Sequence, residues 1–202
     1  NILILKYLKE TGKSNREVEE VAMNYIEAGY KRLISYETQI GGFEWFGHTP
    51  PHEALTAYGL LEFMEMSQFL NVDKKMLQRT REFLLSRRDG KGKFLLASGG
   101  YDRFASVPDV VANIYIVYAL SQAGVTAEIE KEYETAFKDA ISSDDDYKLA
   151  MMALAASNMQ RENDYERLMY ALQVHDEKSG LSAKTSVVNS RDNSLMIETK
   201  AL

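Results

Sequence analysis

Two histidines four residues apart, with an acid directly after the second, are the first side chains in this sequence that could do chemistry. His48 and His52 carry imidazole rings and Glu53 carries a carboxylate, and such groups bind metal ions, transfer protons or attack electrophiles. Their spacing matches no strong metal signature, and the third histidine, His175, lies far along the chain. We therefore expect the two rings to hydrogen-bond across a turn or to face solvent, with a role beside a reactive group as the alternative. No metal ion and no cofactor are predicted.

Acidic side chains form a second candidate group, because each stands where an apolar helix is expected to begin. They are Glu53, Asp109, Asp146 and Glu198. An acid in the first turn of a helix can cap it and interacts favourably with the helix dipole, at ~0.3 to 1 kcal/mol each. This structural role is the simpler interpretation. If the helices were arranged in a ring with one direction, the same carboxylates would gather at one end as an acidic binding face.

Composition limits the partners that these groups could serve. The chain has 202 residues, of which 45% are hydrophobic and 27% charged, and its net charge is -6. Lys and Arg are interleaved with acids rather than clustered, which disfavours a nucleic-acid partner. No run approaches the roughly 18 apolar residues of a membrane span. The absence of cysteine removes disulfides, thiolate metal ligands and cysteine nucleophiles from this chain.

The elements that must position the candidate groups are helices almost throughout. Ser14 and Glu17 are expected to form a capping box ahead of a helix that runs through Leu33. Pro108 is suited to the first turn of a very apolar helix. Hydrophobic periodicity predicts helices over residues 2–9, 53–70, 73–87, 108–123, 126–141, 144–157 and 163–175, and one that opens near residue 194. Short connections between neighbours favour antiparallel hairpins.

Glycine turns recur between these helices. The richest is the stretch GGFEWFGHTPPHEALTAYG, residues 41–59, which joins an aromatic turn to a helix start. Gly42 and Gly92 stand 50 residues apart, and Gly180 follows after another 88, about two periods of the length of a two-helix repeat. Within each period the first helix is the more apolar and the second is amphipathic. This pattern is typical of the inner and outer layers of a helical ring or solenoid.

Six blocks of the sequence resemble, in order, the thioester-containing domain of alpha-2-macroglobulin family proteins. They are NILILKYLKETG, EAGYKRLISYE, GGFEWFG with HEALTAYGLLEF, GKFLLASGGYDRF before ANIYIVYAL, DYKLAMMALAA and SLMIETKAL. The chain is most similar to the bacterial-type branch and is also similar to the corresponding domain of complement components. In that family the domain is an α/α toroid. We therefore predict an all-α fold, an α/α toroid of paired antiparallel helices that is incomplete at both ends.

The resemblance implies that residues 1–202 are a single domain of a larger, multidomain protease-trapping protein, an endopeptidase inhibitor rather than an enzyme. In members that retain the chemistry, a cysteine and a glutamine form an internal thioester, whose motif would lie upstream of the helix at residues 2–9. Cleavage of a bait region exposes this bond, which then acylates the attacker. The expected partners are proteases and other domains of the parent chain. The expected location is extracellular, at the cell surface or in the periplasm.

The resemblance also indicates which side chains would face the thioester. In complement proteins that prefer hydroxyl targets, a histidine in the loop after a DG turn attacks the thioester and passes the acyl group on. The matching loop here, residues 89–104, contains no histidine. Tyr101 and Asp102 fall near that position and are the thioester-facing candidates, with His48 and His52 beside them. Without the histidine, the bond is expected to react directly with amines.

Two other hypotheses stay open. One is a non-covalent interaction module in a parent without a working thioester. The other is an enzyme on the same toroid, because terpene cyclases and some polysaccharide lyases also use glycine-aromatic turns between paired helices. The acidic run at residues 144–146 resembles protonating aspartates, yet Ser142 and Ser143 before it make it a better helix cap. A single Trp also lines no aromatic catalytic chamber.

Overall fold

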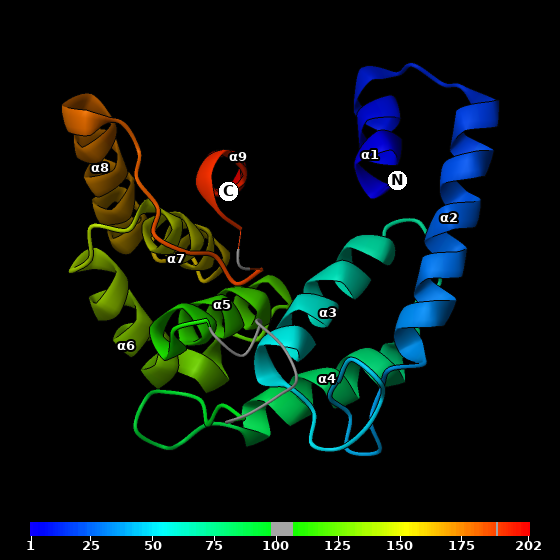
Figure 1. The fold of residues 1–202 in the computed structure, drawn as a ribbon, viewed down its shortest axis with the longest axis horizontal. Coiled ribbons are helices and arrows are strands. Elements are labelled where there is room, and N and C mark those ends of the chain that lie inside the picture. Colours follow the sequence, from blue (N-terminus) through cyan, green and yellow to red (C-terminus); the bar gives the residue numbers. More distant parts are fainter. Residues whose placement is uncertain (98–106, 189) are drawn as a thin grey trace. The chain divides into compact units, whose positions relative to one another are not determined.

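The computed structural model describes residues 1–97, 107–188 and 190–202. Within these ranges the regular elements are α-helices and one short 3₁₀ turn, together with two isolated β-bridges. The prediction of an all-α fold is confirmed (Figure 1). The chain divides into two compact units, the N-terminal unit Asn1–Phe83 and the C-terminal unit Leu84–Leu202.

Every helix predicted from the periodicity is present. The elements are α1 (Ile2–Thr11), α2 (Arg16–Ile34), α3 (Glu53–Met66), α4 (Lys74–Ser86), α5 (Asp109–Gln122), η2 (Ala127–Ile129), α6 (Glu130–Ile141), α7 (Asp146–Asn158), α8 (Glu162–Ser179) and α9 (Asp192–Ala201). The largest differences from the prediction lie at the C-terminal ends of α3 and α8 and at the start of α6, where η2 comes before the α-helix. None of the helices in the described residues has the length and apolar content that a membrane crossing requires.

The start of α2 differs from the prediction by one residue. Its N-cap is Asn15, whose side-chain Oδ1 accepts a hydrogen bond from the backbone N–H of Val18 at 3.2 Å. A carboxylate oxygen of Glu19, and not of Glu17, accepts a hydrogen bond from the backbone N–H of Asn15, also at 3.2 Å. The predicted box of Ser14 and Glu17 is therefore wrong. Asn is as good an N-cap as Ser, so the sequence offers two adjacent caps and the structure uses the second.

The N-terminal unit is built around α3. Helix α1 packs on α2, and α2 packs on α3. Half of the α3 residues are buried, which matches a helix that is apolar on most sides: Glu53, Ala54, Thr56, Ala57, Leu60, Phe63 and Met66. The ring of Tyr30 from α2 meets Phe63 edge-on at 6.0 Å between centroids.

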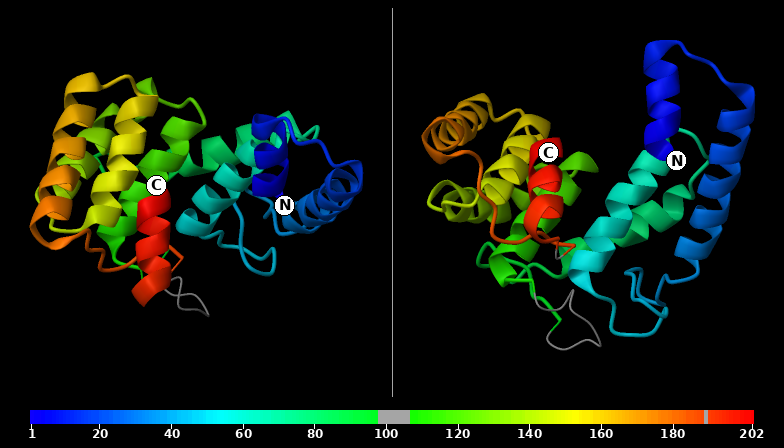
Figure 2. Two further views of the ribbon diagram at one scale, coloured as in Figure 1. Left: turned by 90° about the horizontal axis from the view of Figure 1, so that it is seen from above. Right: turned by 45° about the horizontal axis from the view of Figure 1, so that its top comes forward.

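The C-terminal unit confirms the division into inner and outer helices. In α5 ten of 14 residues are buried and in α7 nine of 13, whereas α8 buries one of 18. Helices α5 and α7 contact each other, α6 lies against α5 and α7, and α8 lies along α7 (Figure 2). The apolar helices are thus covered by amphipathic neighbours, as the sequence pattern predicts.

Candidate functional site

The glycine turn between α2 and α3 is a closed loop that only glycine allows. An antiparallel bridge pairs Glu37 with Phe43, and the N–H of Thr38 donates to the carbonyl of Gly42 at 2.8 Å. Gly41 has a φ of 88°, in the left-handed region. A Cβ on Gly42 would lie 2.6 Å from Cβ of Pro51, closer than packed carbons approach. This turn places both candidate histidines.

His52 works as a helix cap in this turn. It is the N-cap of α3, and its ring Nδ1 accepts the N–H of Leu55 at 3.3 Å. Its own N–H donates to the carbonyl of Phe43 at 2.9 Å. The hydroxyl of Thr56 accepts from the N–H of Phe43 at 2.9 Å and donates to the carbonyl of His52 at 2.8 Å. His52 therefore joins the turn to the helix.

His48 is exposed, and only its backbone is held. The N–H groups of His48 and Phe46 both donate to one carboxylate oxygen of Glu44, at 3.2 and 2.8 Å. Burial acts to raise the pKa of Glu44, but the backbone N–H donors outweigh it and leave the pKa below its usual value. The His48 side chain is exposed and interacts electrostatically with Glu44. Across the described part of the chain, no three His, Asp or Glu side chains stand together as metal ligands.

A second turn in the C-terminal unit repeats this construction. Arg88 pairs with Phe94 across the same six-residue span, and Gly92 has a φ of 99°. The N–H of Phe94 donates to the side chain of Asn113 in α5 at 2.7 Å, as the N–H of Phe43 donates to Thr56 in α3. A Cβ on Gly92 would clash with the hydroxyl oxygen of Thr135 in α6, so this position also requires glycine. The recurring turn read from the sequence is thus a repeated structure, but its register differs by one residue, because Gly92 corresponds to Gly41 and not to Gly42.

The loop that follows this second turn carries two of the candidates. Tyr101 and Asp102 both lie outside the described residues, as does the rest of residues 98–106. The described ends of the loop are anchored, because Phe94 and Val107 are both buried. The Asn113 amide that holds Phe94 also donates to the carbonyl of Asp109 at 2.7 Å. The assignment of Tyr101 and Asp102 to a thioester-facing surface stays a prediction.

The four acidic candidates occupy different environments. Glu53 is buried in the N-terminal unit, at 2% exposure. Asp109 is exposed at the start of α5. In the C-terminal unit Asp146 is fully buried and Glu198 is half-buried. The acidic binding face stays a prediction, and the contacts of Asp146 and Glu198 show more local roles.

Asp146 pairs with His175, a contact that the sequence analysis did not find. Nδ1 of His175 lies 2.7 Å from a carboxylate oxygen of Asp146, and the other carboxylate oxygen accepts the N–H of Ser182. A signal was present in the sequence. Helices α7 and α8 form an antiparallel hairpin whose turn includes Gln160. Asp146 lies 14 residues before Gln160 and His175 lies 15 residues after it, so the hairpin brings them side by side.

Tyr147, the next residue, connects α7 to α9. Its hydroxyl donates to a carboxylate oxygen of Glu198 at 3.0 Å and accepts the N–H of Val187 at 3.3 Å. Burial raises the pKa of Tyr147, and the negative charge of Glu198 adds to the effect. The phenol therefore stays protonated and keeps donating to Glu198.

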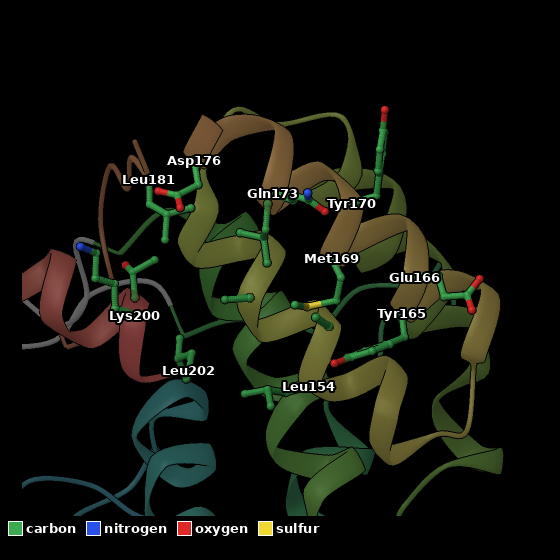
Figure 3. A pocket seen from close by; sticks show the side chains of 14 residues that line it. Leu154, Tyr165, Glu166, Met169, Tyr170, Gln173, Asp176, Leu181, Lys200 and Leu202 are labelled. Carbon is green, nitrogen blue, oxygen red and sulfur yellow. The ribbon is translucent and has the colours of Figure 1, made fainter. Parts of the chain in front are cut away.

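A groove of about 750 Å³ lies among α7, α8 and α9 (Figure 3). Leu154 of α7, Met169 of α8 and Leu202 give it an apolar lining, with Lys200 on the α9 side. Tyr170 projects away from α8 and is 69% exposed. Of the candidate residues that the structure describes, none lines this groove.

Comparison with known proteins gives one family. The family model described as the A-macroglobulin TED domain matches residues 1–200. Ovostatin from Gallus gallus is 28% identical over 134 residues, which cover 61% of this chain and 9% of that protein. Thioester-containing protein 1, allele S3, from Anopheles gambiae is 27% identical over 95 residues, which cover 46% of this chain and 7% of that protein.

A solved structure shows the same fold. The crystal structure of Salmonella alpha-2-macroglobulin reacted with methylamine aligns with a TM-score of 0.60 over 95% of this chain, at 16% sequence identity. The aligned part is 11% of that protein. The 202 residues thus correspond to about a tenth or less of each of these relatives.

Proposed function

The chain belongs to the alpha-2-macroglobulin family through its TED domain, and on that premise we propose that it packs around and presents an internal thioester in a larger protease-trapping protein. The observation that carries the proposal is the family match over residues 1–200, nearly the whole chain. The Anopheles relatives, which are named thioester-containing proteins, support the chemistry. The Salmonella relative, crystallised after reaction with methylamine, supports an amine as the nucleophile.

The proposed reaction is acyl transfer to an amine. The amine nitrogen attacks the thioester carbonyl, a C–N bond forms, the C–S bond breaks, and the proton lost by the amine leaves a free thiol behind. The chain has no cysteine, so the sulfur would come from the parent protein outside these 202 residues. Each thioester reacts once, which makes the parent an inhibitor rather than an enzyme.

Four side chains of this chain are proposed to lie near the bond. Tyr101 and Asp102 fall near the sequence position where complement proteins that prefer hydroxyl targets carry a histidine, and neither is a comparable nucleophile at neutral pH. Among the histidines, His48 is the stronger candidate because its ring is exposed, whereas the ring of His52 caps α3. Attack by a free amine, without a histidine acyl intermediate, follows from this arrangement.

The partners and location follow from the same proposal. The parent protein would trap proteases through its other domains, and this domain would pack against them before cleavage. Such a trap meets its targets outside the cytoplasm, so we place the parent in the extracellular space, at the cell surface or in the periplasm.

The experiment uses the parent protein. If a Cys-x-x-Gln pattern lies within about thirty residues upstream of Asn1, protease-treated parent should incorporate labelled methylamine covalently, at one label per chain. The cysteine-to-alanine variant is the matched control and should incorporate none. An intact motif that takes up no methylamine after cleavage would overturn the proposal and leave a non-covalent interaction module. His48→Gln should keep the labelling, since direct attack needs no imidazole.

A further inference from the structure

We propose that residues 181–188 form a strap, closed over the start of α7 by Asp146 and His175, whose opening releases α9 from α7 as a separate local transition. The inference concerns the C-terminal unit alone and does not rest on the thioester. It rests on a set of contacts made by two consecutive residues of α7, Asp146 and Tyr147. These contacts join three segments that are far apart in the sequence.

The closing contacts begin at Asp146. Its N–H donates to the carbonyl of Ser182 at 2.9 Å, while its carboxylate accepts the N–H of Ser182, so the two residues are joined in both directions. The remaining carboxylate oxygen holds the ring of His175. Asp146 is fully buried and the His175 side chain is 32% exposed. His175 is thus the outer, accessible part of the closure.

The second half of the strap is held by Tyr147. Val187 is buried, and its N–H donates to the Tyr147 hydroxyl. The same hydroxyl donates to Glu198 in α9. Only two residues of α9 are buried, Leu195 and Thr199. Because so little of α9 is packed, the Tyr147 contact and the strap supply much of what keeps α9 in place.

The closed state also contains an unfavourable group. Asp145 is 1% exposed, and neither of its carboxylate oxygens has a hydrogen-bond partner. Its one charged contact among the described ion pairs is with the ammonium of Lys148, which lies 3.7 Å from Oδ2 and is too far for a hydrogen bond. The ammonium of Lys184 in the strap pairs with the exposed carboxylate of Asp144, at 3.6 Å. A buried carboxylate without hydrogen bonds is costly.

These observations describe a bistable element. The residues on either side of Asp145 both contact the strap, Asp144 through Lys184 and Asp146 through Ser182, so opening the strap would expose Asp145 to water, which favours the open state. Opening would also break the contacts of Asp146 and Tyr147, which favours the closed state. Opposing terms of this kind make the free energy of opening much smaller than that of global unfolding. His175 acts as a positioning residue, because it holds Asp146 in the orientation that binds the strap.

The test is hydrogen exchange measured by mass spectrometry on the full chain and its variants. His175→Ala should speed exchange of residues 181–188 and of α9 by about tenfold to hundredfold, since Asp146 loses a charge-assisted bond. His175→Gln, whose amide can still donate a hydrogen bond, should show exchange rates between those of His175→Ala and the wild type. Asp145→Asn, made together with Lys148→Met so that the ammonium is not left without its partner, removes the buried charge and should slow exchange of the same segments. Peptides from α5 should keep their protection in all three variants.

Trypsin provides a second readout, because Lys184 lies in the strap and Arg191 lies just before α9. Cleavage after these residues should be faster in His175→Ala and slower in the double variant of Asp145→Asn with Lys148→Met. His48→Ala, which changes an exposed histidine in the N-terminal unit, is the matched control and should alter neither readout. Unchanged strap exchange in both His175→Ala and the double variant would overturn the proposal. So would an equal loss of protection in α5, which would mean that the pair stabilises the whole unit.

Discussion

Alanine at Gly42 should destabilise the N-terminal unit, and the structure gives the size of the effect. A Cβ at this position would lie 2.6 Å from Cβ of Pro51 and 2.8 Å from Cδ1 of Phe83. Packed carbon atoms prefer about 3.5 to 4.0 Å, so the neighbours must move by roughly 1 Å. Pro51 is a rigid ring and Phe83 is 6% exposed, so neither moves freely. Overpacking of this kind costs about 1 to 3 kcal/mol.

Gly29 provides the matched control, because the same substitution should have the opposite sign there. It lies inside α2, and a Cβ added to it would have no heavy atom within 4 Å. Alanine in a helix interior is favoured over glycine by roughly 0.5 to 1 kcal/mol. Gly42→Ala and Gly29→Ala should therefore differ in unfolding free energy by about 1.5 to 4 kcal/mol.

Urea unfolding followed by tryptophan fluorescence is the direct assay, since Trp45 is the single tryptophan and lies in the turn itself. With a urea dependence of about 1 to 3 kcal/mol per M, the midpoint of Gly42→Ala should fall by about 1 M. Circular dichroism gives an independent transition for the helices. If Gly42→Ala unfolds at the wild-type midpoint, or if Gly29→Ala is the less stable of the two, the packing argument is wrong.

Two further changes test other parts of the molecule. Asn113→Ala removes the acceptor for the N–H of Phe94 at 2.7 Å, so the free energy of unfolding of the C-terminal unit should fall by about 1 to 3 kcal/mol, measured from the urea midpoint by circular dichroism. Thr56→Val should destabilise the turn at Phe43 in the same way. If neither variant loses stability, the two side chains do not share this role. Burial raises the pKa of Glu62, so the stability linked to this group is present below about pH 4 and is lost as the pH rises through its folded-state pKa. Glu62→Gln should therefore be more stable than wild type at pH 7, by at most about 1 kcal/mol, and its unfolding free energy should vary less between pH 4 and pH 7. A steeper pH dependence of the variant's stability would contradict this assignment.

The positions of the helices could be predicted because each depends on its own residues. Apolar spacing and caps are local signals, and the structure follows them through α9. The end of α3 shows where such signals fail. The prediction extended it to residue 70, but the helix ends at Met66 and residues 67–70 form turns, with the N–H of Leu70 donating to the carbonyl of Met66 at 2.8 Å. Apolar side chains continue past the end, so periodicity alone could not mark it.

The turn repeat could be predicted only in part. The spacing of Gly42 and Gly92 indicates a recurring unit, but in the structure the counterpart of Gly92 is Gly41, which shares its positive φ. The acceptors that fix the turns, Thr56 and Asn113, differ in type and lie 13 and 19 residues from their donors. A hydroxyl and an amide can satisfy the same N–H, so residue identity does not reveal the equivalence. Gly180 begins a different arrangement, in which Ser182 bonds to Asp146.

The pairing of Asp146 with His175 shows how fold and site depend on each other. Each residue has an ordinary local interpretation, an acid in the first turn of a helix and a histidine near the end of another. Their contact follows only when the two helices are antiparallel and of matching length, because the start of α7 then lies beside the end of α8. The hairpin was predicted, so the pair could have been deduced by counting outward from the turn. The burial of Asp145 beside it could not, because burial depends on the tertiary path of neighbouring segments, which no local pattern specifies. Side chains that a helical hairpin brings together are therefore accessible to sequence reasoning, whereas those covered by irregular segments require the structure.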